Sequence, residues 1–110
     1  MFQVDGNNIY LTRGDTLVLN VNMNNSDGSY TPVEGESVRF AMKYRYEDSD
    51  ADVIINKNID INTMQLILEP SDTKSLVMGH NYVYDIQYTD TNGNVDTFIK
   101  GYFYVGEEVL

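Results

Sequence analysis

The chain has 110 residues, of which 42% are hydrophobic, and carries a formal net charge of −10 from seventeen acidic and seven basic side chains. This composition predicts one globular domain over residues 1–110, and the absence of cysteine excludes disulfide bonds and thiolate metal sites. So acidic a surface repels phosphate backbones and anionic lipid, which argues against nucleic-acid and membrane-surface partners.

The N-terminal third predicts short strands separated by turns. Residues 2–4 and 9–11 are candidate strands, and Arg13-Gly14-Asp15 is a turn before the next one. The same tripeptide matches an integrin-type motif, but Gly-Asp before a strand is ordinary turn chemistry, and we favour the turn. Residues 16–23 then alternate as a half-buried strand. The inward residues are Leu17, Leu19, Val21 and Met23.

Polar turn residues at 24–29 predict a loop, and Pro32 in the following segment predicts a crossing between sheets. Residues 37–46 give the clearest strand pattern. The expected inward residues are Val38, Phe40, Met42, Tyr44 and Tyr46, and the opposite face carries Arg39, Lys43 and Arg45. This basic strip has two interpretations, a solvated strand face or a contact for an anion or partner. We favour the solvated face, which is normal in antiparallel sheets.

Two loops, 47–52 and 90–96, place aspartates at alternate positions, a spacing that calcium loops use. The pattern is incomplete, because Val53 and Ile59 occupy the positions where an EF-hand needs glycine and glutamate. We therefore predict no metal site in either loop.

The second half predicts two short strands at 53–58 and 64–68, joined by a polar turn. One helical turn follows at 70–76, with Pro70 near its start, and Gly79 ends it.

A long hairpin over 76–105 is the strongest prediction, because two alternating runs flank an Asn92-Gly93 turn. The core-facing residues are expected to be Tyr82, Tyr84, Ile86, Tyr88, Val95, Ile99, Phe103 and Val105. The opposite face of the last strand carries three aromatic residues. Aromatic side chains on an outer face are candidate interface residues. The predicted interface is Phe98, Tyr102 and Tyr104.

The sequence shows no catalytic or cofactor-binding constellation. His80 is the single histidine, and no serine elbow, cysteine nucleophile or glycine-rich phosphate loop accompanies it. We therefore predict neither an enzyme nor a cofactor-dependent protein.

About seven strands at intervals of ten to fifteen residues predict an all-β, immunoglobulin-like antiparallel β-sandwich. The run Leu76-x-x-Gly79-x-x-Tyr82-x-Tyr84-x-Ile86 resembles the corner into strand F of such domains, with the helical turn between strands E and F. The resemblance implies that Tyr82 hydrogen-bonds back to the preceding turn.

A longer resemblance is carried by Gly14-Asp15-Thr16, Asp27-Gly28, Val38-x-Phe40, Ser71-Asp72-Thr73-x-x-Leu76, Asp90-x-x-Gly93 and Gly101-x-Phe103-x-Val105. Together these motifs are similar to the immunoglobulin-like domains of tailed-phage structural proteins, especially the N-terminal domain of baseplate upper proteins.

The resemblance implies a non-enzymatic virion component of a phage or prophage, an accessory or adaptor of the tail or baseplate. Its partners would be other tail proteins or further copies of itself. It would be made in the host cytoplasm, in keeping with a start that lacks the features of a signal peptide. Two alternatives remain open: a carbohydrate-binding module that uses exposed tyrosines, and a calcium-dependent adhesion module that uses the aspartate-rich loops.

Overall fold

The computed structural model describes residues 2–106. Ten strands lie in this range: β1 (Phe2–Asp5), β2 (Asn8–Thr12), β3 (Leu17–Asn20), β4 (Met23–Asn25), β5 (Gly28–Tyr30), β6 (Ser37–Lys43), β7 (Ile55–Ile59), β8 (Gln65–Leu68), β9 (Asn81–Thr89) and β10 (Val95–Gly106). The helical segments are the 3₁₀ turn η1 (Asp50–Asp52) and the single helical turn α1 (Pro70–Thr73). No helix within residues 2–106 combines the length and the apolar character that crossing a membrane requires.

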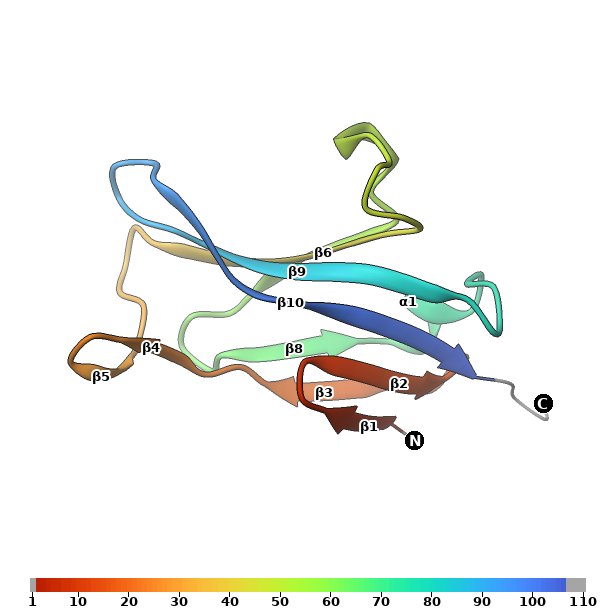
Figure 1. Ribbon diagram of the computed structural model, residues 1–110. Coiled ribbons are helices and arrows are strands. Elements are labelled where there is room, and N and C mark those ends of the chain that lie inside the picture. The colour runs from red at the N-terminus through yellow and green to blue at the C-terminus, as the bar shows by residue number, and fades with distance from the viewer. Residues whose placement is uncertain (1, 107–110) are drawn as a thin grey trace.

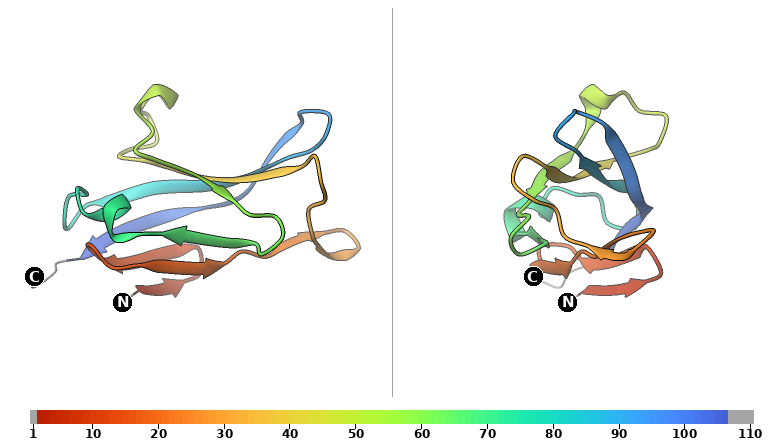
Figure 2. Two further views of the ribbon diagram at one scale, coloured as in Figure 1. Left: turned by 180° about the vertical axis from the view of Figure 1, so that it is seen from behind. Right: turned by 90° about the vertical axis from the view of Figure 1, so that its left-hand side faces the viewer.

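Two layers of strands enclose the core (Figure 1). Six strands form a sheet in the order β1-β2-β10-β9-β6-β7, and β3 pairs with β8 in a second sheet. Seen from behind, β3 and β8 lie in front of β9 and β10 (Figure 2). The small β4–β5 hairpin makes a third sheet. The all-β prediction is confirmed.

The prediction of a purely antiparallel sheet is wrong, because β2 pairs with β10 in parallel. Ile9 and Tyr10 lie opposite Phe103 and Tyr104 in this register. Parallel neighbours cannot be joined by a tight hairpin, so this pairing requires strands that are distant in the sequence. β2 and β10 meet that condition, since they come from opposite ends of the chain.

The predicted long hairpin is confirmed as β9 and β10, which pair from Val95↔Thr89 to Tyr104↔Asn81. Tyr82, Ile86 and Phe103 from this hairpin are buried. They pack with apolar side chains of both layers, since the buried cluster also includes Ile9, Leu11, Leu17, Val38, Phe40, Met42, Leu66, Leu68 and Val105. Burial of each large side chain contributes about 1.5–3 kcal/mol.

A β-bulge in β10 overturns one expectation about its faces. The register shifts between Thr97 and Ile99, so that Phe98 is an extra residue in β10. An extra residue reverses the alternation of side chains on one side of a bulge. Val95, expected to face the core, is therefore 59% exposed.

The strand predicted over 37–46 ends early, at Lys43. A carboxylate oxygen of Asp48 accepts a hydrogen bond from the Arg45 amide at 3.1 Å, and this local turn follows the end of the strand. The expectation that Tyr46 faces the core is therefore wrong.

The prediction of a loop over residues 24–29 is also wrong, because β4 and β5 form a tight hairpin there. Asn25 starts the turn, and its side chain accepts the Asp27 amide at 2.9 Å. Gly28 has a φ of 115°, which favours glycine. The turn residues expected at 24–29 thus close a hairpin between two short strands. Residues 2–106 thus contain ten strands where about seven were expected, and the additional ones are the short strands β1, β4 and β5.

Candidate functional site

The outer face of the six-stranded sheet, which points away from β3 and β8, carries three tyrosines. Tyr10 lies on β2, opposite Tyr104 of β10, and their ring centroids are 6.1 Å apart. Tyr102 lies two residues before Tyr104 and therefore on the same face. The side chains of Tyr10 and Tyr102 are 40% and 49% exposed. We call Tyr10, Tyr102 and Tyr104 the tyrosine surface.

The structure places the predicted interface residues in two different environments. Tyr102 is exposed and Tyr104 is half-buried against Tyr10, both on the outer face as expected. Phe98 lies at the β-bulge, is half-buried and packs against the core, so it does not join them. The sequence did not identify Tyr10 as an interface residue, because only the parallel pairing of β2 with β10 places it next to Tyr104.

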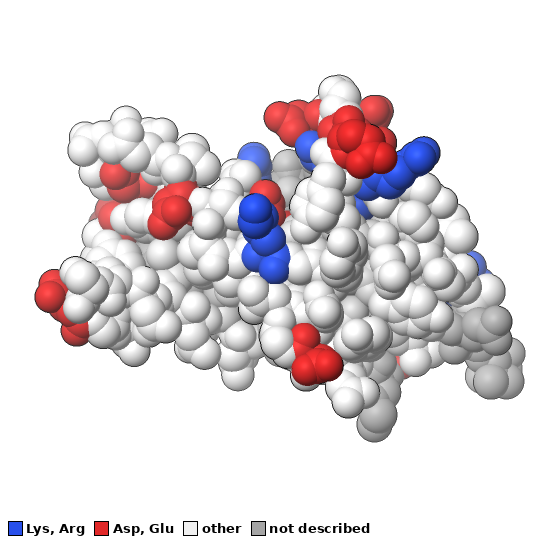
Figure 3. Space-filling view, viewed as in Figure 1, with Lys and Arg blue, Asp and Glu red and all other residues white. Residues whose placement is uncertain are grey.

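Beside the tyrosine surface lies a hollow of about 370 Å³ between the strands and the loop that follows β6. The loop, residues 44–54, folds back over the outer face, and its acidic side chains are gathered at the top of Figure 3. Val83, which alternates with the core-facing Tyr82 and Tyr84 on β9, is only 6% exposed and lines the hollow. The hollow is lined by Arg39, Ala41, Lys43, Tyr46, Asp50, Val53, Asn56, Val83, Tyr84, Asp85 and Gln87.

Lys43, at the end of β6, holds the loop in place. Its ammonium group donates to the Asp48 carbonyl at 3.1 Å and to the Asp50 carboxylate at 2.7 Å. The hydrogen bond and charge of Lys43 lower the pKa of Asp50. Ser49 caps η1 by accepting the Ala51 amide at 3.2 Å. These local contacts make the hollow part of the folded structure rather than a space between unrelated segments.

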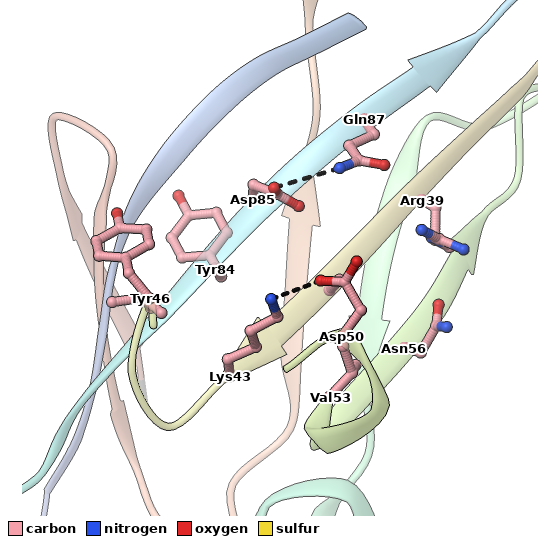
Figure 4. Close-up of a pocket in the computed structure, with 11 residues that line it drawn as sticks. Arg39, Lys43, Tyr46, Asp50, Val53, Asn56, Tyr84, Asp85 and Gln87 are labelled. Carbon is pink, nitrogen blue, oxygen red and sulfur yellow. Dashed lines mark hydrogen bonds and ion pairs between the residues drawn. The ribbon is translucent and has the colours of Figure 1, made fainter. Parts of the chain in front are cut away.

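The polar side chains of the hollow come from three adjacent strands and the loop. Figure 4 shows Asp85 and Gln87 side by side on β9, with Arg39 across from them and the Lys43–Asp50 pair nearby. The Gln87 amide donates to Asp85 at 3.4 Å. Two cations and two carboxylates line the hollow, so its formal charge is balanced although the chain is strongly acidic.

The arrangement weakens the anion-binding interpretation of the basic strip on β6. Lys43 is already paired with Asp50. The Arg45 guanidinium lies over the ring of Tyr44 at 5.6 Å. An anion entering near Arg39 would also meet Asp85. Carboxylates beside Lys43 and Arg39, and an aromatic ring beneath Arg45, disfavour an anionic ligand at this strip.

Tyr46 connects the hollow to the tyrosine surface. Its side chain is 54% exposed, and its ring centroid lies 6.4 Å from that of Tyr102. Partial burial raises the pKa of the Tyr46 hydroxyl, and the nearby Tyr102 and Asp85 raise it further. Tyr46 was not predicted as a surface residue, because the strand pattern of residues 37–46 assigned it to the core.

His80 has a structural role. Its ring stacks on Tyr44, with centroids 3.6 Å apart, and its Nε2 lies 2.8 Å from the Tyr44 carbonyl oxygen. Because a carbonyl only accepts, Nε2 carries the proton and donates. His80 thereby fixes the point where the 44–54 loop leaves β6.

In the second aspartate-rich loop the Asp90 carboxylate bonds to its own loop. Asp90 accepts the amides of Asn92 and Asn94, both at 2.9 Å, and these bonds lower its pKa. In the part of the chain that the structure describes, no group of three histidine, aspartate or glutamate side chains could hold a metal ion.

The Arg13-Gly14-Asp15 segment forms the predicted turn. The Arg13 guanidinium donates to the Leu76 carbonyl at 3.4 Å, and the Gly14 amide donates to the Thr73 hydroxyl at 3.2 Å. All three residues are half-buried. The turn connects β2 to β3 and is hydrogen-bonded to the segment around α1, so it is not a free loop.

Comparison of the chain with protein-family models, with curated protein sequences and with solved structures finds no match. The tyrosine surface and the hollow are therefore defined by the geometry of this chain alone.

Proposed function

We propose that this chain is a non-enzymatic interaction module that binds a protein through the tyrosine surface. The observation that carries the proposal is the side-by-side placement of Tyr10, Tyr102 and Tyr104 on an outer sheet face. Exposed aromatic clusters are uncommon on monomers and enriched at interfaces, where they bury much area at a low entropic cost.

The backbone beneath the tyrosine surface is tied together by contacts beyond the strand pairing, and such preorganisation favours binding. The Asn8 side chain accepts the Tyr102 amide at 3.1 Å. Gly101, the residue before Tyr102, packs directly against the backbone of Asn7. β2 and β10 are thereby fixed to each other at the point where the tyrosines stand.

An immunoglobulin-like β-sandwich is part of the proposal. It is supported by the order β2-β10-β9-β6-β7 in one layer, with β3 and β8 in the other and α1 between β8 and β9. The Val77 amide donates to the Tyr82 hydroxyl at 2.8 Å. This bond matches the tyrosine corner of such domains, in which a tyrosine near the start of strand F bonds to backbone a few residues upstream.

The resemblance of the chain's motifs to domains of tailed-phage structural proteins supports a more specific assignment, a tail or baseplate component of a phage or prophage. On this assignment the tyrosine surface packs on another tail protein or on a second copy of the chain. Surface complementarity is the whole mechanism, and no chemical step is involved.

Light scattering over a wide concentration range tests the version in which a second copy is the partner. We expect a defined oligomer that Tyr102→Ala with Tyr104→Ala converts to monomer. Val18→Ala with Ile67→Ala is the matched control, because these exposed residues pair across β3 and β8 on the other sheet. A monomer at every concentration would exclude self-assembly and leave only a different protein as partner.

A further inference from the structure

The hollow beside Tyr46 has the dimensions and the fixed walls of a small-molecule site. Its volume of about 370 Å³ lies at the lower end of the range for ligand pockets, about 300–1,000 Å³. β6, β7 and β9 form its floor, and the 44–54 loop is attached to that floor by Lys43. A ligand would enter a site that is already assembled.

The polar groups of the hollow are suited to hydroxyl groups. The Asp85 carboxylate accepts one long bond from Gln87, and it has lone pairs left for further donors. Arg39 and Asn56 add a planar fork of donors and an amide that both donates and accepts. Neighbouring hydroxyls of a sugar ring each donate and accept, so a carboxylate and a guanidinium can each bind two of them at once.

An aromatic ring stands at the side of this polar floor. Tyr46 is exposed, and Tyr102 lies next to it on the sheet. A sugar ring has one or both faces covered by C–H groups, and such a face packs on an aromatic ring while the hydroxyls at its edge remain free. The hollow therefore offers an apolar platform and convergent polar groups together.

The charges of the hollow indicate that the ligand is neutral. Arg39 and Lys43 are balanced by Asp50 and Asp85, so neither an anion nor a cation gains a net attraction. We propose that the hollow binds a neutral carbohydrate of one or two sugar rings, with Tyr46 as the stacking platform and Asp85 and Arg39 as hydroxyl-binding groups. This site goes beyond the protein-binding role of the tyrosine surface and uses different residues.

A glycan array that carries neutral, sialylated and sulfated sugars tests the proposal with the full chain. We expect binding of neutral glycans. The free monosaccharide at the end of the best-bound glycan is then titrated into ¹⁵N-labelled protein. Amide shifts should concentrate on residues 39–56 and 83–87, and the β3 and β8 amides should stay unchanged.

Two variants identify the residues responsible. Tyr46→Ala removes the platform, and Asp85→Asn keeps the shape of the side chain but removes its charge and one of its two acceptors. Tyr46→Ala should weaken binding about two- to tenfold, the effect of losing one aromatic contact, and Asp85→Asn about tenfold or more, the effect of losing one charged hydrogen bond. Ile67→Ala is the control, since it removes an exposed apolar side chain from β8, on the other sheet, that neither lines the hollow nor belongs to the tyrosine surface. It should bind like the unaltered chain.

Three results would overturn the proposal: no neutral glycan bound, binding restricted to charged glycans, or shifts that fall outside the hollow. Equal binding by Tyr46→Ala, with an unchanged circular dichroism spectrum, would do the same. A protein that competes for the hollow while every glycan fails would also count against it. The tyrosine-surface proposal stands or falls separately, because it is tested at Tyr102 and Tyr104.

Discussion

The hydroxyl of Tyr84 donates a hydrogen bond of 2.5 Å to the backbone carbonyl of Asn7. Tyr84 lies on β9, and Asn7 lies in the turn between β1 and β2, so the bond reaches across β10. It passes Gly101, where the missing side chain leaves room for the tyrosine ring. Burial raises the pKa of Tyr84 to about 12, so the phenol keeps the proton that it donates.

Gly101→Ala should destabilise the protein by about 1–3 kcal/mol, the usual cost of overpacking a core. A Cβ at this position would overlap the Asn7 carbonyl, which is backbone and cannot move aside cheaply. Gly106→Ala, in the same strand, is the control, because the nearest atom would be 3.8 Å away, at ordinary contact distance. Urea unfolding measures the stability of the two variants. Equal unfolding midpoints for Gly101→Ala and Gly106→Ala would contradict the prediction.

Tyr82→Phe should cost about 0.5–1.5 kcal/mol, because it removes the acceptor of the Val77 amide hydrogen bond, which is partly buried. The ring itself is buried and would keep its packing in the variant. Tyr102→Phe removes an equivalent hydroxyl from an exposed ring and should leave the melting temperature unchanged. Thermal unfolding of both variants tests the hydrogen bond between Val77 and Tyr82. Equal melting temperatures of the two variants would show that this bond has no stabilising role.

The Glu36 carboxylate should make stability depend on pH in the acid range. It accepts hydrogen bonds from the Tyr30 hydroxyl at 2.7 Å, from the Tyr88 hydroxyl and from the Val33 amide at 2.9 Å. These bonds, that of Tyr30 first, lower its pKa in the folded state. A carboxylate with a lowered folded pKa stabilises the protein above its unfolded pKa of about 4.3, and this stabilisation is lost as the pH falls through the folded value.

Glu36→Gln should therefore narrow the difference in stability between neutral and acid pH. Glu34→Gln removes the same charge from an exposed position in the same loop and serves as the control. The test compares the urea midpoints of Glu36→Gln, Glu34→Gln and the unaltered chain at a series of pH values. If both variants follow the pH profile of the unaltered chain, Glu36 is not the responsible group.

Asp50→Asn should loosen the 44–54 loop without unfolding the domain. The Lys43–Asp50 ion pair is exposed on the Asp50 side, and exposed pairs contribute little to global stability. Local opening costs less than global unfolding and is governed by such contacts. Hydrogen exchange should become faster within 44–54 and stay unchanged in β9, with no shift of the urea midpoint. Unaltered exchange in the loop would show that other contacts hold it.

The strands of the core were predictable from the sequence because their side chains alternate without interruption. The buried positions of β9 follow the expected pattern of Tyr82, Tyr84 and Ile86. Val95 departs from expectation because the bulge at Phe98 reverses the alternation. A bulge leaves the pattern on each side intact and only changes how the two sides are joined, so a single sequence does not reveal it.

The candidate sites were less predictable, because non-local pairing and loop geometry create them. Tyr102 and Tyr104 could be found from strand alternation, but Tyr10 joins them only through the parallel β2–β10 register. Tyr46 enters the hollow because Asp48 and Lys43 turn the chain after β6. Neither the parallel pairing nor the turn after β6 produces a periodic pattern in the sequence.

The parallel pairing of β2 with β10 also determines the order in which the molecule can assemble. Among the strands of residues 2–106, the β1–β2 hairpin is synthesised before all the others, yet β10, its partner in the large sheet, is synthesised after them. Pairings between such distant segments form slowly, since the whole intervening chain must be brought into place beforehand. We therefore expect the N-terminal hairpin to dock last, after β9 and β10 have paired, as the closing step of folding.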